Sequence, residues 1–259
     1  MQLRSHPYFS MSFDFIANIL FPPLCVACGD RIGRGVVCEA CLSGIVLRAG
    51  FLCGECHEPA GVPLVGAAAG ASVCHPEFPY ILGAATDYTD KTVQSLIHHL
   101  KFRSINRAAE PLAELVVRYL QRTGSLIADL WFDTPFVIVP IPLSTQRRRT
   151  RGYNQAELIA RLVACALEIP IVTDALIRSK HTKPQSDAAS VAERLENIRG
   201  AYAVRGSGSV GGAASNVIRG ANIILIDDVS TTGATFLEAS RTLKAAGAEK
   251  IIAVAVAKT

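Results

Sequence analysis

The chain has 259 residues, which is long for one small domain and short for two large ones. Half of the residues are hydrophobic, so the chain can bury a full core. Its net charge of +4 is too mild to indicate a polyanionic partner by itself. No run of about 20 apolar residues occurs, so we expect no membrane span.

Residues 1–24 form an N-terminal segment with a predicted short amphipathic helix. Phe13, Ile16, Ile19 and Leu20 would share one helical face that packs on the rest of the protein. The segment lacks the charged, apolar and small-residue order of a signal peptide, and it lacks the basic face of a membrane-surface helix. The first ten residues have no evident structural role, which makes Met11 an alternative start.

Seven of the eight cysteines lie within residues 25–78, which we interpret as a zinc-ribbon-like module. Nothing in the sequence indicates secretion, so we expect a cytoplasmic chain in which paired cysteines bind metal rather than form disulfides. Two cysteines separated by two residues place both thiolates on one tight turn. The complete four-cysteine set, which predicts a structural zinc site without catalytic function, is Cys25, Cys28, Cys38 and Cys41.

A second set is one thiolate short, because Cys53, Cys56 and Cys74 have no fourth cysteine. The candidate fourth ligands are His57, His75 and Glu77, although a residue adjacent to Cys74 is expected to be poorly placed. A second site without zinc remains an alternative, as does a crossed arrangement in which the first and third pairs share one metal. The remaining cysteine, Cys165, is expected to be a small buried core residue.

Residues 79–259 alternate between predicted strands and helices, which indicates a mostly parallel α/β sheet. The predicted strands are 80–88, 136–140, 201–204, 223–226 and 251–256, and the predicted helices are 92–102, 108–121, 156–167, 191–198 and 236–246. The Gly-rich stretches 61–72 and 205–220 are predicted loops. In sheets of this kind, ligands bind beyond the carboxyl ends of the strands.

The strand at 223–226 is followed by Asp227 and Asp228, then by a loop rich in threonine that contains Gly233. The free N–H groups of the next helical turn and the positive end of its dipole favour an anion. Carboxylates do not bind phosphate directly, but they accept hydrogen bonds from a sugar diol or hold Mg²⁺. The combination therefore predicts a site for a phosphorylated ribose, whereas simple helix capping explains one acid and one threonine.

A second group of candidate residues surrounds the proline-rich turn at 140–142. Four arginines follow within five residues, Arg147, Arg148, Arg149 and Arg151, and their mutual repulsion favours an anionic partner over a solvated loop. Charge alone does not decide between pyrophosphate and nucleic acid. Lys101, at the end of a predicted helix, either neutralises phosphate or complements the helix dipole. Asn154 either caps the following helix or contacts a ligand.

The segment from Asp227 to Thr235 resembles the phosphoribosyl pyrophosphate (PRPP) motif of type I phosphoribosyltransferases. From about Phe21 to the C-terminus, the chain resembles the ComF family of competence-associated proteins, which combine an N-terminal zinc region with a phosphoribosyltransferase-like domain. The further segments that carry this resemblance are Val139–Pro142, Arg151–Gln155, and Gln185 with Arg194 and Asn197. The family pattern has a fourth cysteine near the position of Glu77.

The resemblance implies structural zinc, Mg²⁺ bound with PRPP, and transfer of a 5-phosphoribosyl group to a nitrogen acceptor with release of pyrophosphate. Asp227 and Asp228 would hold the ribose diol as catalytic residues. The implied phosphate-binding residues are Ser230, Thr231, Thr232, Gly233, Ala234, Thr235, Pro140, Ile141, Pro142, Arg151 and Lys101. The implied partners are PRPP or a related phosphoribosyl ligand, single-stranded DNA and DNA-uptake proteins. A non-catalytic DNA-binding or docking protein of the competence machinery is the alternative.

Overall fold

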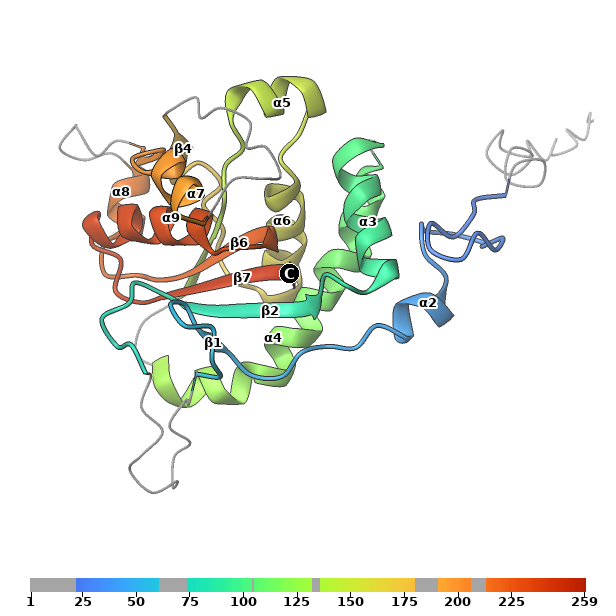
Figure 1. Ribbon diagram of the computed structural model, residues 1–259, viewed down its shortest axis with the longest axis horizontal. Helices are drawn as coiled ribbons and strands as arrows, with labels where there is room; N and C mark the ends of the chain where they lie inside the picture. Colours follow the sequence, from blue (N-terminus) through green and yellow to red (C-terminus); the bar gives the residue numbers. More distant parts are fainter. Residues whose placement is uncertain (1–21, 61–73, 104, 132–135, 180–190, 206–212) are drawn as a thin grey trace, which may run out of the picture.

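The computed structural model describes residues 22–60, 74–103, 105–131, 136–179, 191–205 and 213–259. Its centre is a five-stranded sheet in the order β1-β2-β7-β6-β3, in which β1 is antiparallel to β2 and the other pairs are parallel (Figure 1). The strands are β1 (Leu52–Cys53), β2 (Ile81–Asp87), β7 (Ile251–Lys258), β6 (Asn222–Ser230) and β3 (Phe136–Pro140). The predicted mostly parallel α/β fold is therefore confirmed.

Alternate residues of the central strands enter two separate hydrophobic cores. In β6, Ile224 and Ile226 face α3 (Lys91–Phe102), α4 (Ala109–Trp131) and α6 (Gln155–Leu167). Ile223 and Leu225 face α9 (Ala234–Ala245) and the two-stranded antiparallel sheet of β4 (Leu176–Arg178) and β5 (Tyr202–Val204). A strand buried on both faces needs the unbroken apolar run seen in the sequence.

Both edges of the central sheet are covered by irregular chain. The backbone N–H of Arg48 donates to Ala85 O (2.9 Å), and Leu52 pairs with Leu82, so the segment before and within β1 runs along the outer edge of β2. At the other edge, Val172 N donates to Ile138 O (2.9 Å) of β3. These contacts satisfy backbone groups that an open edge would leave exposed.

The remaining helices lie around this framework. The segment with α2 (Glu39–Ser43) extends away from the sheet, and α5 (Thr145–Arg151) projects beyond it next to α3 (Figure 1). The other elements are α7 (Val191–Ile198), which packs on α9, α8 (Ala213–Ile218) and a 3-10 turn at Asn106–Ala108. No helix in the described part of the chain is long and apolar enough to cross a membrane.

Several local expectations were wrong. β6 continues through both acids to Ser230, because pairing with β7 holds the chain extended beyond the apolar run. The arginine run forms helix α5, which Ser144 caps by accepting from Arg147 N, and α8 occupies part of the predicted loop 205–220. Cys165 is exposed rather than buried. The predicted helix at 13–20, the loop 61–72 and Gln185 lie outside the described residues.

Candidate functional site

The two acids of β6 lie side by side at the carboxyl edge of the sheet and differ in their partners. Asp228 is almost buried, and its Oδ1 lies 2.9 Å from the Nζ of Lys101 at the end of α3. Asp227 is partly exposed, and its Oδ1 accepts a hydrogen bond from the backbone N–H of Asp228 (2.8 Å). Lys101 thus contacts one of the two acids directly.

The pKa of Asp227 is raised to about 7. Burial among protein atoms is the largest cause, and the neighbouring carboxylate of Asp228 is the second. Lys101 and Arg178 act in the opposite direction, but more weakly. Two adjacent carboxylates with one close cation resist carrying two negative charges, which a Mg²⁺ ion or a hydroxyl donor would relieve.

The free energy of unfolding is expected to fall between pH 5 and pH 8 because of Asp227. An unfolded aspartate has a pKa near 3.9, so between about pH 4 and pH 7 the folded state holds the extra proton. Stability is therefore lost as the pH rises toward 7. We expect a loss on the order of 2 kcal/mol, since each pKa unit corresponds to about 1.4 kcal/mol and water entering the cleft weakens the effect.

Urea denaturation of the wild type and Asp227→Asn at both pH values measures this loss, which should be absent from the variant. Asp87→Asn is the control, because hydrogen bonds from Thr89 lower the pKa of that exposed acid. Asp87 is therefore ionised in both the folded and the unfolded state from pH 5 to pH 8, and its variant should keep the full loss. If the free energy of unfolding falls equally in Asp227→Asn and in the wild type, groups other than Asp227 cause the loss.

The loop after β6 forms a small cradle at the start of α9. Ser230, Thr231, Thr232 and the helix start line a cavity of about 50 Å³. Gly233 has φ +74°, a left-handed conformation that side-chain-bearing residues adopt at a cost, and α9 begins directly after it. The cradle therefore joins hydroxyl groups to the free N–H groups of a twelve-residue helix, which suits a phosphate group.

A larger cleft of about 330 Å³ joins this cradle, the two acids and the proline-rich turn. Asn154 Nδ2 donates to Ile141 O (2.9 Å), which fixes the turn against the start of α6. Arg151 Nη1 donates to Gln155 Oε1 (3.1 Å), and the guanidinium lies 5.3 Å from the centre of the Phe102 ring. These side chains hold the turn and Arg151 in place at the cleft wall.

The four arginines near α5 do not form one cluster. Arg147 and Arg151 line the cleft that contains the acids, whereas Arg148 and Arg149 line a neighbouring cleft of about 380 Å³. Helical geometry explains the division, because residues four apart share a face and adjacent residues do not. This division was not predicted from the sequence, because the arginine run was treated as a loop rather than a helix.

The cleft wall also contains two residues that the sequence did not single out. Arg178 and Tyr202 come from β4 and β5, and the guanidinium lies 5.8 Å from the centre of the tyrosine ring. The strand that contains Tyr202 was predicted at 201–204, but without a role at the site, whereas β4 was not predicted because three residues are too few to leave a periodic signal. Arg194 and Asn197 both belong to α7, and the side chain of Asn197 does not line this cleft.

Unpaired polar atoms concentrate around the candidate site. Within the described residues, the buried atoms without a hydrogen-bond partner include Asn154 Oδ1, Gln155 Nε2, Tyr202 Oη and Ser230 Oγ. These four residues line the cleft or the cradle. A buried polar group without a partner costs about 1–3 kcal/mol, so their gathering here indicates a site for a polar ligand.

The first cysteine set comes together in space as its spacing indicates. The sulfur atoms of Cys25, Cys28, Cys38 and Cys41 all lie within 4.8 Å of one another, an arrangement that could hold a metal ion. The Sγ atoms of Cys28 and Cys38 are 3.8 Å apart. Four sulfurs around a zinc ion at 2.3 Å are separated by about 3.8 Å, so the donor set fits zinc.

The second cluster contains Cys53, Cys56, Cys74 and His75, again within 4.8 Å. His75 Nδ1 lies 3.4 Å from Cys53 Sγ, and Nε2 lies 3.8 Å from a Glu55 oxygen. His75, directly after Cys74, is therefore well placed to be the fourth ligand, contrary to the expectation for a residue adjacent to a ligand. A carboxylate on the second ring nitrogen is the usual arrangement for a metal-bound histidine. His57 and Glu77 are outside the cluster, and pairs one and three do not share a site.

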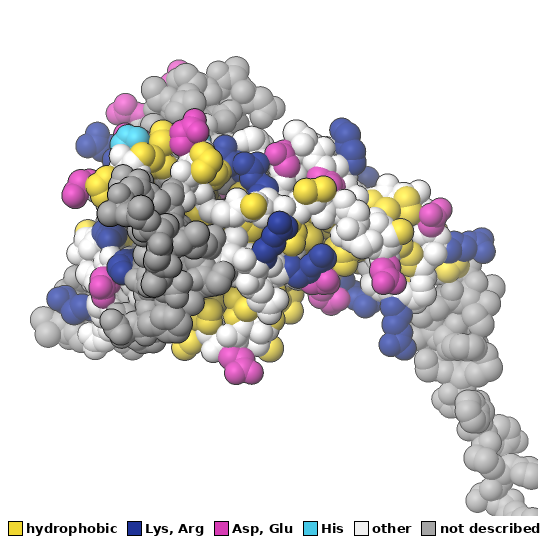
Figure 2. All heavy atoms as spheres, turned by 90° about the horizontal axis from the view of Figure 1, so that it is seen from below, with side chains coloured by type: hydrophobic (Ala, Val, Ile, Leu, Met, Phe, Trp, Pro, Cys, Tyr) yellow, Lys and Arg dark blue, Asp and Glu magenta, His cyan; other side chains and the backbone are white. Residues whose placement is uncertain are grey.

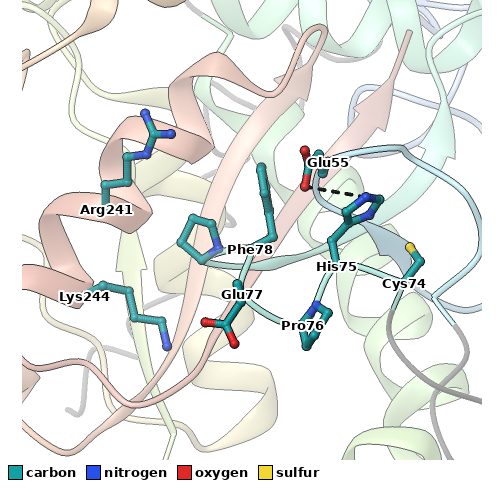
Figure 3. Close-up of a pocket in the computed structure, with 9 residues that line it drawn as sticks. Glu55, Cys74, His75, Pro76, Glu77, Phe78, Arg241 and Lys244 are labelled. Atoms are coloured by element: carbon teal, nitrogen blue, oxygen red, sulfur yellow. Dashed lines mark ion pairs between the residues drawn. The ribbon is translucent and has the colours of Figure 1, made fainter.

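Two members of the second cluster, Cys74 and His75, line a cleft of about 720 Å³ (Figure 3). Arg241 and Lys244 of α9 form the opposite wall, and Glu77 extends toward Lys244, away from Cys74. The second cluster therefore lies on the α9 side of the molecule.

Together, the parallel sheet, the acids on β6 and the cradle before α9 define a phosphoribosyltransferase-like domain. The model of the phosphoribosyl transferase domain family matches residues 150–259. The chain is 30% identical to "Competence protein F" of Haemophilus influenzae over 233 residues, 88% of this chain and 87% of the relative. It is 28% identical to "Competence protein ComFC" of Bacillus subtilis (85% and 88% covered) and 27% identical to "DNA utilization protein YhgH" of Escherichia coli K12 (89% and 94%). The chain belongs to the ComF family.

Proposed function

We propose that this protein binds PRPP with Mg²⁺ and is built to transfer the 5-phosphoribosyl group to a nitrogen acceptor. The observation that carries the proposal is one cleft that contains two adjacent acids, a phosphate cradle and several unpaired buried polar atoms. A phosphorylated ribose presents a diol and a phosphate at opposite ends, which matches this arrangement.

In the proposed complex, Asp227 and Asp228 accept hydrogen bonds from the ribose diol. The backbone and hydroxyl groups of residues 230–235 hold the 5-phosphate. The turn at 140–142, with Arg147 and Arg151, faces the pyrophosphate and its Mg²⁺. Transfer of the sugar requires no protein nucleophile, because positioning and stabilisation of the leaving pyrophosphate supply the rate enhancement.

Lys101 has a double role in this proposal. Its ammonium lies 2.9 Å from Asp228 Oδ1, at one of the carboxylates that would hold the ribose diol. Because Lys101 lines the same cleft as Arg147 and Arg151, a ribose hydroxyl bound to Asp228 would leave the ammonium available to the phosphate groups. The residue then neutralises phosphate charge, as the family resemblance implies.

Structural zinc in both cysteine clusters is a further part of the proposal. The donor sets and spacings suit tetrahedral zinc, and neither cluster includes a residue of the cleft. The metals would supply folding energy to the N-terminal module rather than chemistry.

Isothermal titration with PRPP and Mg²⁺ tests the function. A saturable heat that needs Mg²⁺ and is absent with ribose supports the proposal, whereas heat that does not saturate rejects it. Release of pyrophosphate in the presence of candidate nitrogen acceptors then distinguishes a transferase from a binding protein.

Single-stranded DNA is the second candidate ligand. The observation that favours it is the exposed basic helix α5, together with relatives named for competence and DNA utilization. The face shown in Figure 2 is seen from the side away from α5, and on it basic and acidic side chains are intermixed. Binding through α5 would be weak, in the micromolar range or above at physiological salt, and sensitive to salt.

Replacing Arg147, Arg148, Arg149 and Arg151 with alanine is expected to weaken DNA binding equally across sequences. Four phosphate contacts give a log–log salt slope of about −3 for single strands, which the variant should lose. Fluorescence anisotropy at several salt concentrations measures the slope.

The split between two clefts sharpens this test. Arg148→Ala/Arg149→Ala should weaken DNA binding alone, whereas Arg147→Ala/Arg151→Ala should weaken both DNA and PRPP binding. The matched control is Arg118→Ala/Arg122→Ala, on the exposed face of α4. DNA binding that ignores both salt and PRPP would instead favour a docking role for the cysteine module.

A further inference from the structure

Tyr80 lies between the second cysteine cluster and the phosphate cradle. Its side chain is 3% exposed, and its hydroxyl oxygen is 3.4 Å from Gly54 O and 3.4 Å from Gly233 O. Gly54 is inside the Cys53–Cys56 turn, and Gly233 is inside the cradle. Burial raises the pKa of Tyr80, so the hydroxyl keeps its proton and donates to either carbonyl. One side chain therefore touches both sites.

The contact leaves no free space on either side. A Cβ atom on Gly233 would lie 2.7 Å from the Tyr80 hydroxyl oxygen. A Cβ atom on Gly54 would lie 2.6 Å from the Phe78 ring and 2.6 Å from Tyr80 O. Interiors packed this closely transmit displacement rather than absorb it.

A row of aromatic rings continues the contact into the domain. The ring centres of Phe78 and Tyr80 are 5.1 Å apart, and those of Tyr80 and Phe236, in the first turn of α9, are 6.1 Å apart. The Cys53–Cys56 turn is also fixed to the sheet, because Cys53 pairs with Ile81 next to Tyr80. The cluster, Tyr80 and the start of α9 thus form one packed unit.

The backbone beside the cluster has an unusual conformation. His57, directly after Cys56, has φ +61°, and its ring nitrogen Nε2 would lie 3.8 Å from a Cβ on Gly233. A residue with a side chain keeps a left-handed backbone only where its surroundings enforce it. His57 follows directly after Cys56, so this conformation places its ring between the second cluster and Gly233.

We propose that Tyr80 is a positioning residue through which occupancy of the second cysteine cluster sets the shape of the phosphate cradle. When the cluster holds its metal, Gly54 fixes Tyr80, and Tyr80 packs against Gly233 and holds the cradle in the conformation that binds a phosphate group. When the metal leaves, the turn relaxes, the ring follows, and the affinity for the phosphate ester falls. The effect on affinity rests on the proposed function, but the effect on the cradle does not.

Hydrogen exchange of peptides covering 230–236 tests the effect on the cradle without any ligand. His75→Ala, which removes one ligand of the second cluster, should make this segment exchange about tenfold faster. Cys28→Ser, which damages the first cluster, should leave it unchanged. The affinity for PRPP should fall by about tenfold in His75→Ala, within the usual range for coupling between sites.

Tyr80→Phe separates coupling from general damage, because it removes the hydroxyl and keeps the ring. It should loosen the cradle without loss of metal, and adding His75→Ala to it should have less effect than His75→Ala alone. By linkage, PRPP should raise the equilibrium affinity for one metal equivalent, measured by competition with a chelator, in the wild type but not in Tyr80→Phe. Tyr119→Phe is the control, because that buried hydroxyl donates to Gly50 O instead.

Cradle exchange that is the same in His75→Ala and the wild type overturns the inference, and so do effects of the two substitutions that simply add. A wild-type protein that does not bind PRPP, but whose cradle responds to His75→Ala, would reject the proposed function and leave this inference standing. Should His75→Ala fail to fold, exchange in Tyr80→Phe and in the chelator-treated wild type gives the same comparison.

Discussion

Asp227→Asn/Asp228→Asn is expected to abolish PRPP binding, with a loss of more than a hundredfold in affinity. Hydrogen bonds from a neutral donor to a charged acceptor contribute about 1.5–3 kcal/mol each, and two of them are removed together. Each asparagine also presents an N–H₂ group where a hydroxyl donor or Mg²⁺ would bind. Isothermal titration of the double variant measures the loss.

The fold of the double variant should survive. Removing the charge of Asp227 relieves the burial and repulsion that raise its pKa, which offsets the lost ion pair between Asp228 and Lys101. The melting temperature should therefore stay within a few degrees of the wild type. Asp87→Asn is the matched control, because this acid also ends a central strand but does not line the cleft. Unchanged PRPP affinity in the double variant, with an unchanged melting temperature, would show that the site is elsewhere.

Protein purified without oxygen should contain two equivalents of zinc. The sequence alone predicts one tightly held zinc and a second that is substoichiometric or missing, because position 77 lacks a thiolate. The location of His75 changes that expectation, since it completes a set of four ligands. Cys28→Ser and His75→Ala should each lose one equivalent, whereas Glu77→Gln should lose none. Metal analysis by mass spectrometry measures all four proteins.

Removal of both metals should unfold the N-terminal module but not the sheet. No side chain of α2 is buried, and residues 25–50 contribute only a few side chains, such as Val36 and Ile45, to the core. Zinc binding to small domains supplies about 10–16 kcal/mol of apparent folding free energy. Hydrogen exchange after chelation should show rapid exchange over residues 25–50 and persistent protection in β6 and β7. Anaerobic protein that contains no zinc would reject the metal module altogether.

Two kinds of sequence pattern predicted the fold well: the apolar stripes of helices and the continuous apolar runs of buried strands. Four of the five predicted strands and most helices lie within two residues of their observed positions, because the strands are buried apolar runs and the helices have clear apolar stripes. The exception among the strands is 223–226, since β6 continues four residues beyond the apolar run. β4 and β5 contribute Arg178 and Tyr202 to the cleft, yet they are three residues long and pair only with each other. Their role depends on packing that no local pattern records.

The contact between Lys101 and Asp228 could not be predicted from the sequence either. The two residues are far apart in the sequence, and either one alone has an ordinary explanation as a helix-end lysine or a helix cap. Similarly, adjacency made His75 an unpromising ligand, because the expectation assumed a regular backbone after Cys74. The spacing of the cysteines identified the module. Only the structure, which brings His75 close to Cys53, Cys56 and Cys74, identified the fourth ligand of the second set.

The chain segment that covers the edge of β2 is held in place by the two cysteine clusters, so the clusters protect that edge from pairing with another molecule. The segment that hydrogen-bonds to Ala85 and Leu82 lies between Cys41 and Cys53, so each of its ends is held by a different cluster. Loss of metal at either end would release this segment and bare an apolar parallel strand, which is a template for pairing with another molecule. Metal-depleted protein should therefore self-associate, and light scattering after chelation would detect it. Zinc supply would then set how much of the protein stays dispersed, independently of any ligand in the cleft.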